Sequence, residues 1–295
     1  MTDHDVSGVN DPEELEATGA PASGEIAAST TLGPVHLTVA DLDRWVGFYR
    51  DAVGLELLGR DDGTASFGAG GRELVVGVEE PGARPAVGYT GLYHVALLLP
   101  QRADLARWLA HAGRDRVPLT GLSDHFVSEA IYLTDPDGHG IEIYWDRPRE
   151  HWEGQVEARM TTLPLDVNDL LGEIEDPAND RFEGLPAGTI VGHVHLKVAS
   201  IDETEAFYRD VLGFGLMASL GAQATFLAAG GAALRQATVV LPDAAERDRL
   251  LARVRDAGHD LEEGPAGPVV ADPSGNRLVL AVASEAAGDG AAAPR

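Results

Sequence analysis

An internal repeat constrains the fold of this chain more than any other feature of its sequence. Residues 34–58 (PVHLTVADLDRWVGFYRDAVGLELL) match residues 193–217 (HVHLKVASIDETEAFYRDVLGFGLM) at a constant offset of 159. A second match joins residues 134–144 (TDPDGHGIEIY) to residues 271–282 (ADPSGNRLVLAV). The chain is therefore predicted to contain two homologous halves.

The repeat divides the 295 residues into five segments. The two ends lack hydrophobic periodicity and are predicted to be disordered acidic tails. Two homologous domains lie between them, joined by a polar linker. In chain order, the predicted segments are the tail 1–30, the first domain 31–147, the linker 148–188, the second domain 189–283 and the tail 284–295.

Each half is predicted to contain two β-α-β-β-β units. The first unit opens with an alternating strand over 35–39. A helix follows, with apolar residues at three- to four-residue spacing: Leu42, Trp45, Val46, Tyr49 and Val53. Gly54 and Gly213 are natural helix ends, and Ser200 and Glu203 have the spacing of a capping box. The fold class is therefore α+β, with helices on the outer faces of small curved sheets.

The second half is shorter than the first by about one strand. Phe67 and Leu92 are 25 residues apart, whereas their repeat counterparts Phe226 and Leu234 are only 8 apart, a difference of 17. We expect the loss of a strand to expose a sheet edge and to open the second half. A second copy of the chain could cover such an edge, so a homodimer is one expected assembly.

The charge is strongly unbalanced. The chain has 48 acidic and 22 basic residues, a formal net charge of −26, and Lys197 is its only lysine. Such a surface repels nucleic acid and anionic lipid, and its composition resembles that of halophilic proteins in a salt-rich cytoplasm. No apolar run approaches the roughly 18 residues of a membrane span. Because cysteine is absent, any metal must be held by histidine and carboxylate.

Four longer stretches carry a family resemblance: residues 91–109, 123–152, 185–198 and 207–214. They resemble the vicinal oxygen chelate superfamily, and within it the two-domain catechol-2,3-dioxygenase-like branch. The resemblance covers about residues 32–282. It implies tandem βαβββ modules paired into two homologous domains, the second lacking about one strand. Members of this superfamily pair two such modules into a cup that holds a divalent metal, usually through two histidines and one glutamate.

The resemblance also implies the metal ligands. It places His94 and Glu142 of the first half, and His193 of the second, at ligand positions. Their repeat counterparts cannot form an equivalent set, because they are Gln236, Val279 and Pro34. His36 lies two residues from Pro34 on the same face of its strand and is the alternative to His193 as third ligand. Fe(II) is the implied ion; Mn(II), Ni(II) and Zn(II) suit similar ligands.

Two further residues have catalytic roles implied by the resemblance. His125 and Tyr132 lie near the positions where ring-cleaving members place a histidine and a tyrosine, although His125 is displaced by about two residues. Considered alone, they would be a loop histidine and a core tyrosine. No residue is assigned to substrate binding. Three other histidines are expected to be solvated: His111, His151 and His259.

Three functions remain open at this point. The leading hypothesis is a metal-dependent extradiol (catechol 2,3-) dioxygenase-like protein that cleaves or binds small aromatic diols with O₂. The second is a diverged, non-catalytic small-molecule-binding module, which Pro34 and Val279 favour. The third is a glyoxalase-like lyase or isomerase, whose second metal-binding glutamate has no counterpart that we can identify. A cytoplasmic protein without nucleic-acid or membrane partners is expected in each case.

Overall fold

The computed structural model describes most of the two halves and part of the linker. Most of the predicted tails lie outside the described residues, as do residues 228–235, where the second half is shortened. The described residues are 25–27, 29–85, 90–152, 155, 162–177, 179–219, 225–227 and 236–283.

The first half folds as two β-α-β-β-β units, as predicted. The first unit consists of β1 (Thr31–Val39), α1 (Leu42–Phe48) continued by a π-helical turn η1 (Tyr49–Val53), β2 (Glu56–Asp61), β3 (Thr64–Ala69) and β4 (Arg72–Glu79). The second consists of β5 (Gly91–Leu98), α2 (Arg102–Asp115), β6 (Leu119–Asp124), β7 (Ser128–Thr134) and β8 (Gly140–Asp146), followed by a 3₁₀ turn η2 (Arg149–His151).

The second half repeats this order in shorter form. Its elements are β10 (Ile190–Lys197), α5 (Ile201–Ala206), a π-helical turn η3 (Phe207–Val211), β11 (Leu216–Ser219), β12 (Thr225–Leu227), β13 (Gln236–Leu241), α6 (Ala244–Asp256), β14 (Leu261–Gly264), β15 (Gly267–Ala271) and β16 (Arg277–Val282). Ser200 accepts a hydrogen bond from the Glu203 amide at the start of α5, and Gly54 and Gly213 follow the two π turns with φ of 86° and 87°. None of the described helices is long and apolar enough to span a bilayer.

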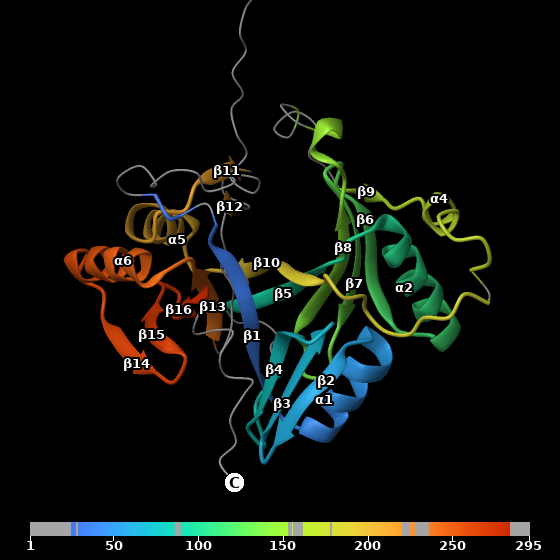
Figure 1. Ribbon diagram of the computed structural model, residues 1–295, viewed down its shortest axis with the longest axis horizontal. Helices are drawn as coiled ribbons and strands as arrows, with labels where there is room; N and C mark the ends of the chain where they lie inside the picture. The colour runs from blue at the N-terminus through green and yellow to red at the C-terminus, as the bar shows by residue number, and fades with distance from the viewer. Residues whose placement is uncertain are drawn as a thin grey trace, which may run out of the picture.

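The strands assemble across the boundary between the halves (Figure 1). One sheet has the order β14-β15-β16-β13-β1-β4-β3-β2 and a second begins β10-β5-β8-β7-β6. Each large sheet therefore joins one unit of the first half to strands of the second. The predicted domain ranges follow the sequence repeat, whereas the sheets do not.

The shortening of the second half has a visible consequence at β10. Its counterpart β1 lies between β13 and β4, but among the described strands β10 pairs only with β5. No described strand of the second half corresponds to β4. The strands β11 and β12 form a separate two-stranded sheet. Among the described strands, the second half therefore has no counterpart of β4, in agreement with its predicted shortening, and β10 is the last described strand of its sheet.

The hydrophobic cores follow the halves more closely than the sheets do, although Val191 of β10 belongs to the first core and Leu92 and Val194 pack against both. One cluster of buried residues includes Trp45 and Phe67 of the first unit with Trp108 and Ile143 of the second. A second cluster contains residues of α6 and of the second half's strands, such as Leu250. Each half is therefore stabilised by its own buried apolar surface.

The linker is more than a polar connection. It contains β9 (Leu163–Pro164), which pairs with β6, and α4 (Val167–Leu171), beside α2. Leu170 and Ile174 are buried in the core of the first half. The expectation that His111 is solvated is wrong: its ring is buried and stacks at 4.3 Å on Phe182 of the linker.

The repeated Asp-Pro turns each bury an aspartate that connects a turn to a helix. Asp135 accepts hydrogen bonds from the backbone of Asp137 and His139 and from the indole of Trp45, and its carboxylate lies 2.9 Å from the His139 ring. Asp272 accepts equivalent bonds in the second half, including one from the Tyr208 hydroxyl. In both halves, a buried aspartate therefore links the two units by hydrogen bonds.

We expect Asp135→Ala to lower the free energy of unfolding by about 3 kcal/mol, because it leaves several buried donors without an acceptor. Urea unfolding in KCl measures this change. The control is Asp43→Ala, which removes an exposed ion pair with Arg60 and an acidic residue from the first turn of α1, and which should change stability by less than ~1 kcal/mol. Equal effects of the two substitutions on stability would contradict the proposed importance of the Asp135 hydrogen bonds.

Candidate metal centre

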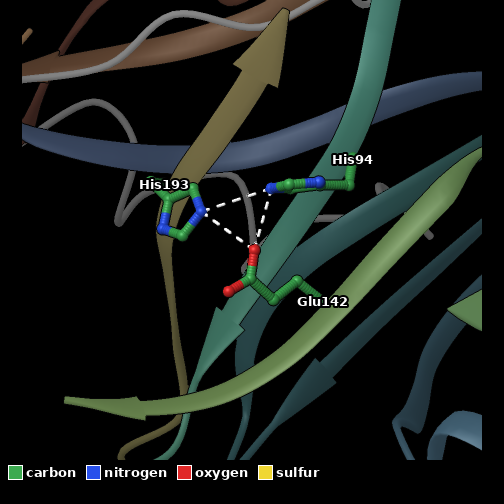
Figure 2. A group of neighbouring side chains, drawn as sticks. All are labelled: His94, Glu142 and His193. Carbon is green, nitrogen blue, oxygen red and sulfur yellow. Dashed lines mark hydrogen bonds and ion pairs between the residues drawn. The ribbon is translucent and has the colours of Figure 1, made fainter. Parts of the chain in front are cut away.

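Three side chains from three neighbouring strands point toward one another (Figure 2). His94 lies on β5, Glu142 on β8 and His193 on β10. Glu142 Oε2 lies 2.8 Å from His94 Nε2 and 3.1 Å from His193 Nε2, and the two histidine Nε2 atoms are 3.3 Å apart. Among the described residues, this is the group of histidine and carboxylate side chains that could hold a metal ion.

Strand register explains why these residues meet. Glu142 on β8 and His193 on β10 both lie opposite Ala96 of β5, and His94 lies two residues from Ala96 on the same face of that strand. Ala96 is fully buried and small, so it leaves space between the side chains of its neighbours. Gly140, opposite His94, has no room for a side chain, because a Cβ there would lie 2.1 Å from the Tyr93 carbonyl oxygen.

Burial and charge favour the protonation states that metal binding requires. Glu142 and His94 are buried, whereas the His193 side chain is 44% exposed. Burial lowers the pKa of His94, although Glu142 opposes this, so the neutral imidazole is favoured. Burial alone would raise the pKa of Glu142, but His193 and His94 outweigh it and hold this pKa well below its ordinary value. His94 therefore offers a neutral imidazole and Glu142 an ionised carboxylate.

The distances between the three side-chain atoms fit a bound metal ion. Ligands at neighbouring corners of an octahedron, each ~2.1 Å from the metal, lie about 3.0 Å apart, whereas tetrahedral ligands lie about 3.4 Å apart. The observed separations of 2.8 and 3.1 Å are closer to the octahedral value, whereas 3.3 Å is closer to the tetrahedral one, so the spacing suits a metal ion without selecting one geometry. Two histidines and one carboxylate on one face are the ligand set of non-haem Fe(II) oxygenases.

Two β-bulges in the pairing of β10 with β5 lie on either side of the stretch that contains His193. Between β10 and β5 the register shifts once at Gly192 and once at Tyr93, while His193, Val194 and His195 pair regularly with β5. Gly33, the repeat counterpart of Gly192, lies within the corresponding register shift of β1. Bulges redirect side chains near functional sites.

Gly192 also makes room for a residue that packs on a ligand. The Tyr144 ring lies 4.9 Å from the His193 ring in an edge-to-face arrangement, and a Cβ on Gly192 would lie 2.0 Å from the Tyr144 hydroxyl oxygen. Neither residue was singled out in the sequence, although the Gly33–Gly192 match within the repeat could have indicated the glycine.

His125 and Tyr132 lie next to the metal group and contact each other. Tyr132 pairs in register with Glu142, and its ring lies 5.6 Å from that of His94. The Tyr132 hydroxyl lies 2.8 Å from His125 Nε2, and Thr162 lies 3.3 Å from His125 Nδ1. Burial, followed by the charge of Glu142, raises the pKa of Tyr132, which keeps the phenol protonated.

His36 does not join the group. It lies on β1 opposite Gln236, in the other large sheet. The same register shows that Pro34, Gln236 and Val279 occupy the positions equivalent to His193, His94 and Glu142: His36 pairs with Gln236 as His195 pairs with His94. Within the described structure, the repeat therefore has a ligand group at one of its two equivalent positions.

We expect Gly192→Ala to lower the free energy of unfolding by about 1–3 kcal/mol, because the added methyl group collides with the Tyr144 hydroxyl. Tyr144→Phe should recover part of this loss in the double variant, which urea unfolding of the four proteins measures. Gly113→Ala is the matched control, since a Cβ there meets nothing within 4 Å. Full additivity of Gly192→Ala and Tyr144→Phe would argue against the contact.

Comparisons with known proteins agree with this fold. Residues 31–143 match the model of the Glyoxalase/Bleomycin resistance protein/Dioxygenase superfamily. A catechol-2,3-dioxygenase of Bacillus subtilis (strain 168) is 38% identical over 276 residues, which are 84% of this chain and 95% of the relative.

Two solved structures share the fold at low sequence identity. One is a Bacillus subtilis protein assigned as a dioxygenase (TM-score 0.58, 14% identity, 85% of this chain and 84% of the other). The other is glyoxalase I from Zea mays (TM-score 0.53, 16% identity, 88% of this chain and 95% of the other). From the matched family model and the long, well-covered relative, the chain belongs to the Glyoxalase/Bleomycin resistance protein/Dioxygenase superfamily.

Proposed function

We propose that this protein is a metal-dependent extradiol dioxygenase that cleaves a small aromatic diol with O₂. The observation that carries the proposal is the convergence of His94, Glu142 and His193 on one point beside the His125–Tyr132 pair. The similarity to a relative named catechol-2,3-dioxygenase supports the reaction class.

His94, Glu142 and His193 would hold the ion, with Fe(II) as the preferred metal. Three protein ligands on one face leave three further positions, which would let Fe(II) accept two adjacent diol oxygens and O₂. The partly exposed His193 lies on the solvent side of this group, whereas Glu142 anchors it from the buried side.

His125 and Tyr132 would serve in proton transfer and hydrogen bonding at the site. A protonated Tyr132 hydroxyl can donate a hydrogen bond to a diol oxygen, and His125 Nε2 can accept a proton from the diol and return it to the product. Contact between the two side chains lets a change of protonation at His125 alter which hydrogen bond Tyr132 makes. Thr162, brought close by the linker, lies beside the other ring nitrogen of His125.

The ligand count favours this function over the glyoxalase-like alternative. That alternative calls for a second glutamate, and the described group contains only Glu142. A purely non-catalytic binding module would not require a buried carboxylate beside two imidazoles, an arrangement that is costly unless the charge is paired.

The protein loaded anaerobically with Fe(II) in KCl should retain about one ion per chain after dialysis. His94→Ala, Glu142→Ala and His193→Ala should each remove most of the bound iron, because each deletes a ligand. His36→Ala should retain it, since His36 lies in the other sheet. Metal analysis measures the ratio; iron lost equally in the His36 variant would contradict the proposed ligand set.

His125→Ala and Tyr132→Phe should each lower kcat for catechol by roughly 10²- to 10⁴-fold, the usual contribution of positioned proton-transfer groups. Bound iron should stay at the wild-type level, which separates a catalytic effect from loss of the metal. Oxygen uptake with catechol measures the rate. A wild-type kcat in both variants would contradict the proposed roles of His125 and Tyr132 in proton transfer.

A further inference from the structure

Three side chains beside the metal group have no role in the function proposed so far. They are Tyr93, His195 and Lys197. The His195 ring lies 4.9 Å from His94 and 4.8 Å from Tyr93, and Lys197 Nζ lies 4.5 Å from the centre of the Tyr93 ring. These contacts form a continuous path from a metal ligand to an ammonium group.

A β-bulge directs Tyr93 into this path. His195 pairs with His94 and Leu196 pairs with Leu92, so Tyr93 is the extra residue on β5. In a regular strand, Tyr93 and His94 would point to opposite faces. Instead their rings are 5.4 Å apart, and 47% of Tyr93 is exposed to solvent. A large, exposed aromatic residue beside a site of this kind offers a surface on which a ligand ring can pack.

Lys197 differs from most basic residues of the described structure in the contacts of its charged group. It is the only lysine in a chain of net charge −26, and no described carboxylate forms an ion pair with it. Many arginines of the described structure do have carboxylate partners: Arg102 contacts Glu129, and Arg147 contacts Asp124. The Lys197 ammonium is held over an aromatic ring instead, which leaves its N–H donors available to an anion.

The overall charge makes this local cation important for substrate choice. A surface with 26 excess negative charges repels an anionic substrate, and a lone ammonium beside the site counteracts that repulsion where the substrate enters. A neutral diol has no group with which a cation could pair. A diol with a carboxylate on its ring could pair with Lys197 while its oxygens face the metal group.

We propose that Lys197, with Tyr93 and His195, forms a recognition subsite for an anionic ring substituent, so that the substrate class is a carboxylate-bearing aromatic diol. This inference rests on the proposed function and narrows it. Lys197 is a specificity-determining residue here and takes no part in bond breaking. Tyr93 lines the space between the metal group and the ammonium.

Binding of two probes to the Fe(II)-loaded protein under anaerobic conditions tests the subsite. The probes are 3,4-dihydroxybenzoate and 1,2-dihydroxybenzene, and calorimetry gives their Kd values at the lowest KCl concentration that keeps the chain folded. Wild type should bind the carboxylated diol about tenfold more tightly, the size of one charge-assisted hydrogen bond. Lys197→Met should remove this preference, whereas Lys197→Arg should keep most of it.

Arg277→Met is the matched control, because it makes the same change in net charge at a surface ion pair in the other sheet. It should leave the ratio of the two Kd values unchanged. If both diols bind and Lys197→Met preserves the wild-type ratio, the subsite is wrong while the proposed function stands. If the iron-loaded wild type binds neither diol, the proposed function fails and this inference fails with it.

Discussion

The antiparallel pairing of β5 with β10 is the interaction on which the site depends. It joins a strand of the first half to a strand of the second and sets His193 opposite Ala96, one position across from Glu142 on β8. A slip of one residue would turn His193 to the opposite face of the sheet. The bulges at Gly192 and Tyr93 bound the regular stretch and fix its register.

Repeat symmetry produced two equivalent positions, and only one has the chemistry of a metal centre. β1 pairs with β13 as β10 pairs with β5, and both pairs retain a glycine at the bulge, Gly33 or Gly192. Proline and valine at positions 34 and 279 cannot supply metal ligands. Among the described strands no counterpart of β4 covers β10, and the His193 side chain is partly exposed.

Each half contains most of one hydrophobic cluster, while the sheets join the halves. Trp45 and Asp135 connect the two units of the first half, and Tyr208 and Asp272 do the same in the second. The three side chains of the candidate metal group therefore come from both halves, which strand pairing joins. Such a centre responds to how the halves dock as well as to the identity of its ligands.

The sequence by itself determined the repeated units, the helix ends at Gly54 and Gly213, the missing strand and the residue types His94, Glu142 and His193, because local periodicity and the repeat record these features. It left open whether His36 or His193 completes the group. Only the tertiary structure decided that question, since strand partners far apart in the chain are chosen by packing and register. The same reason applies to other residues near the site. Bulges and cross-strand contacts, which no local pattern specifies, set the positions of Tyr93, Tyr144 and Lys197.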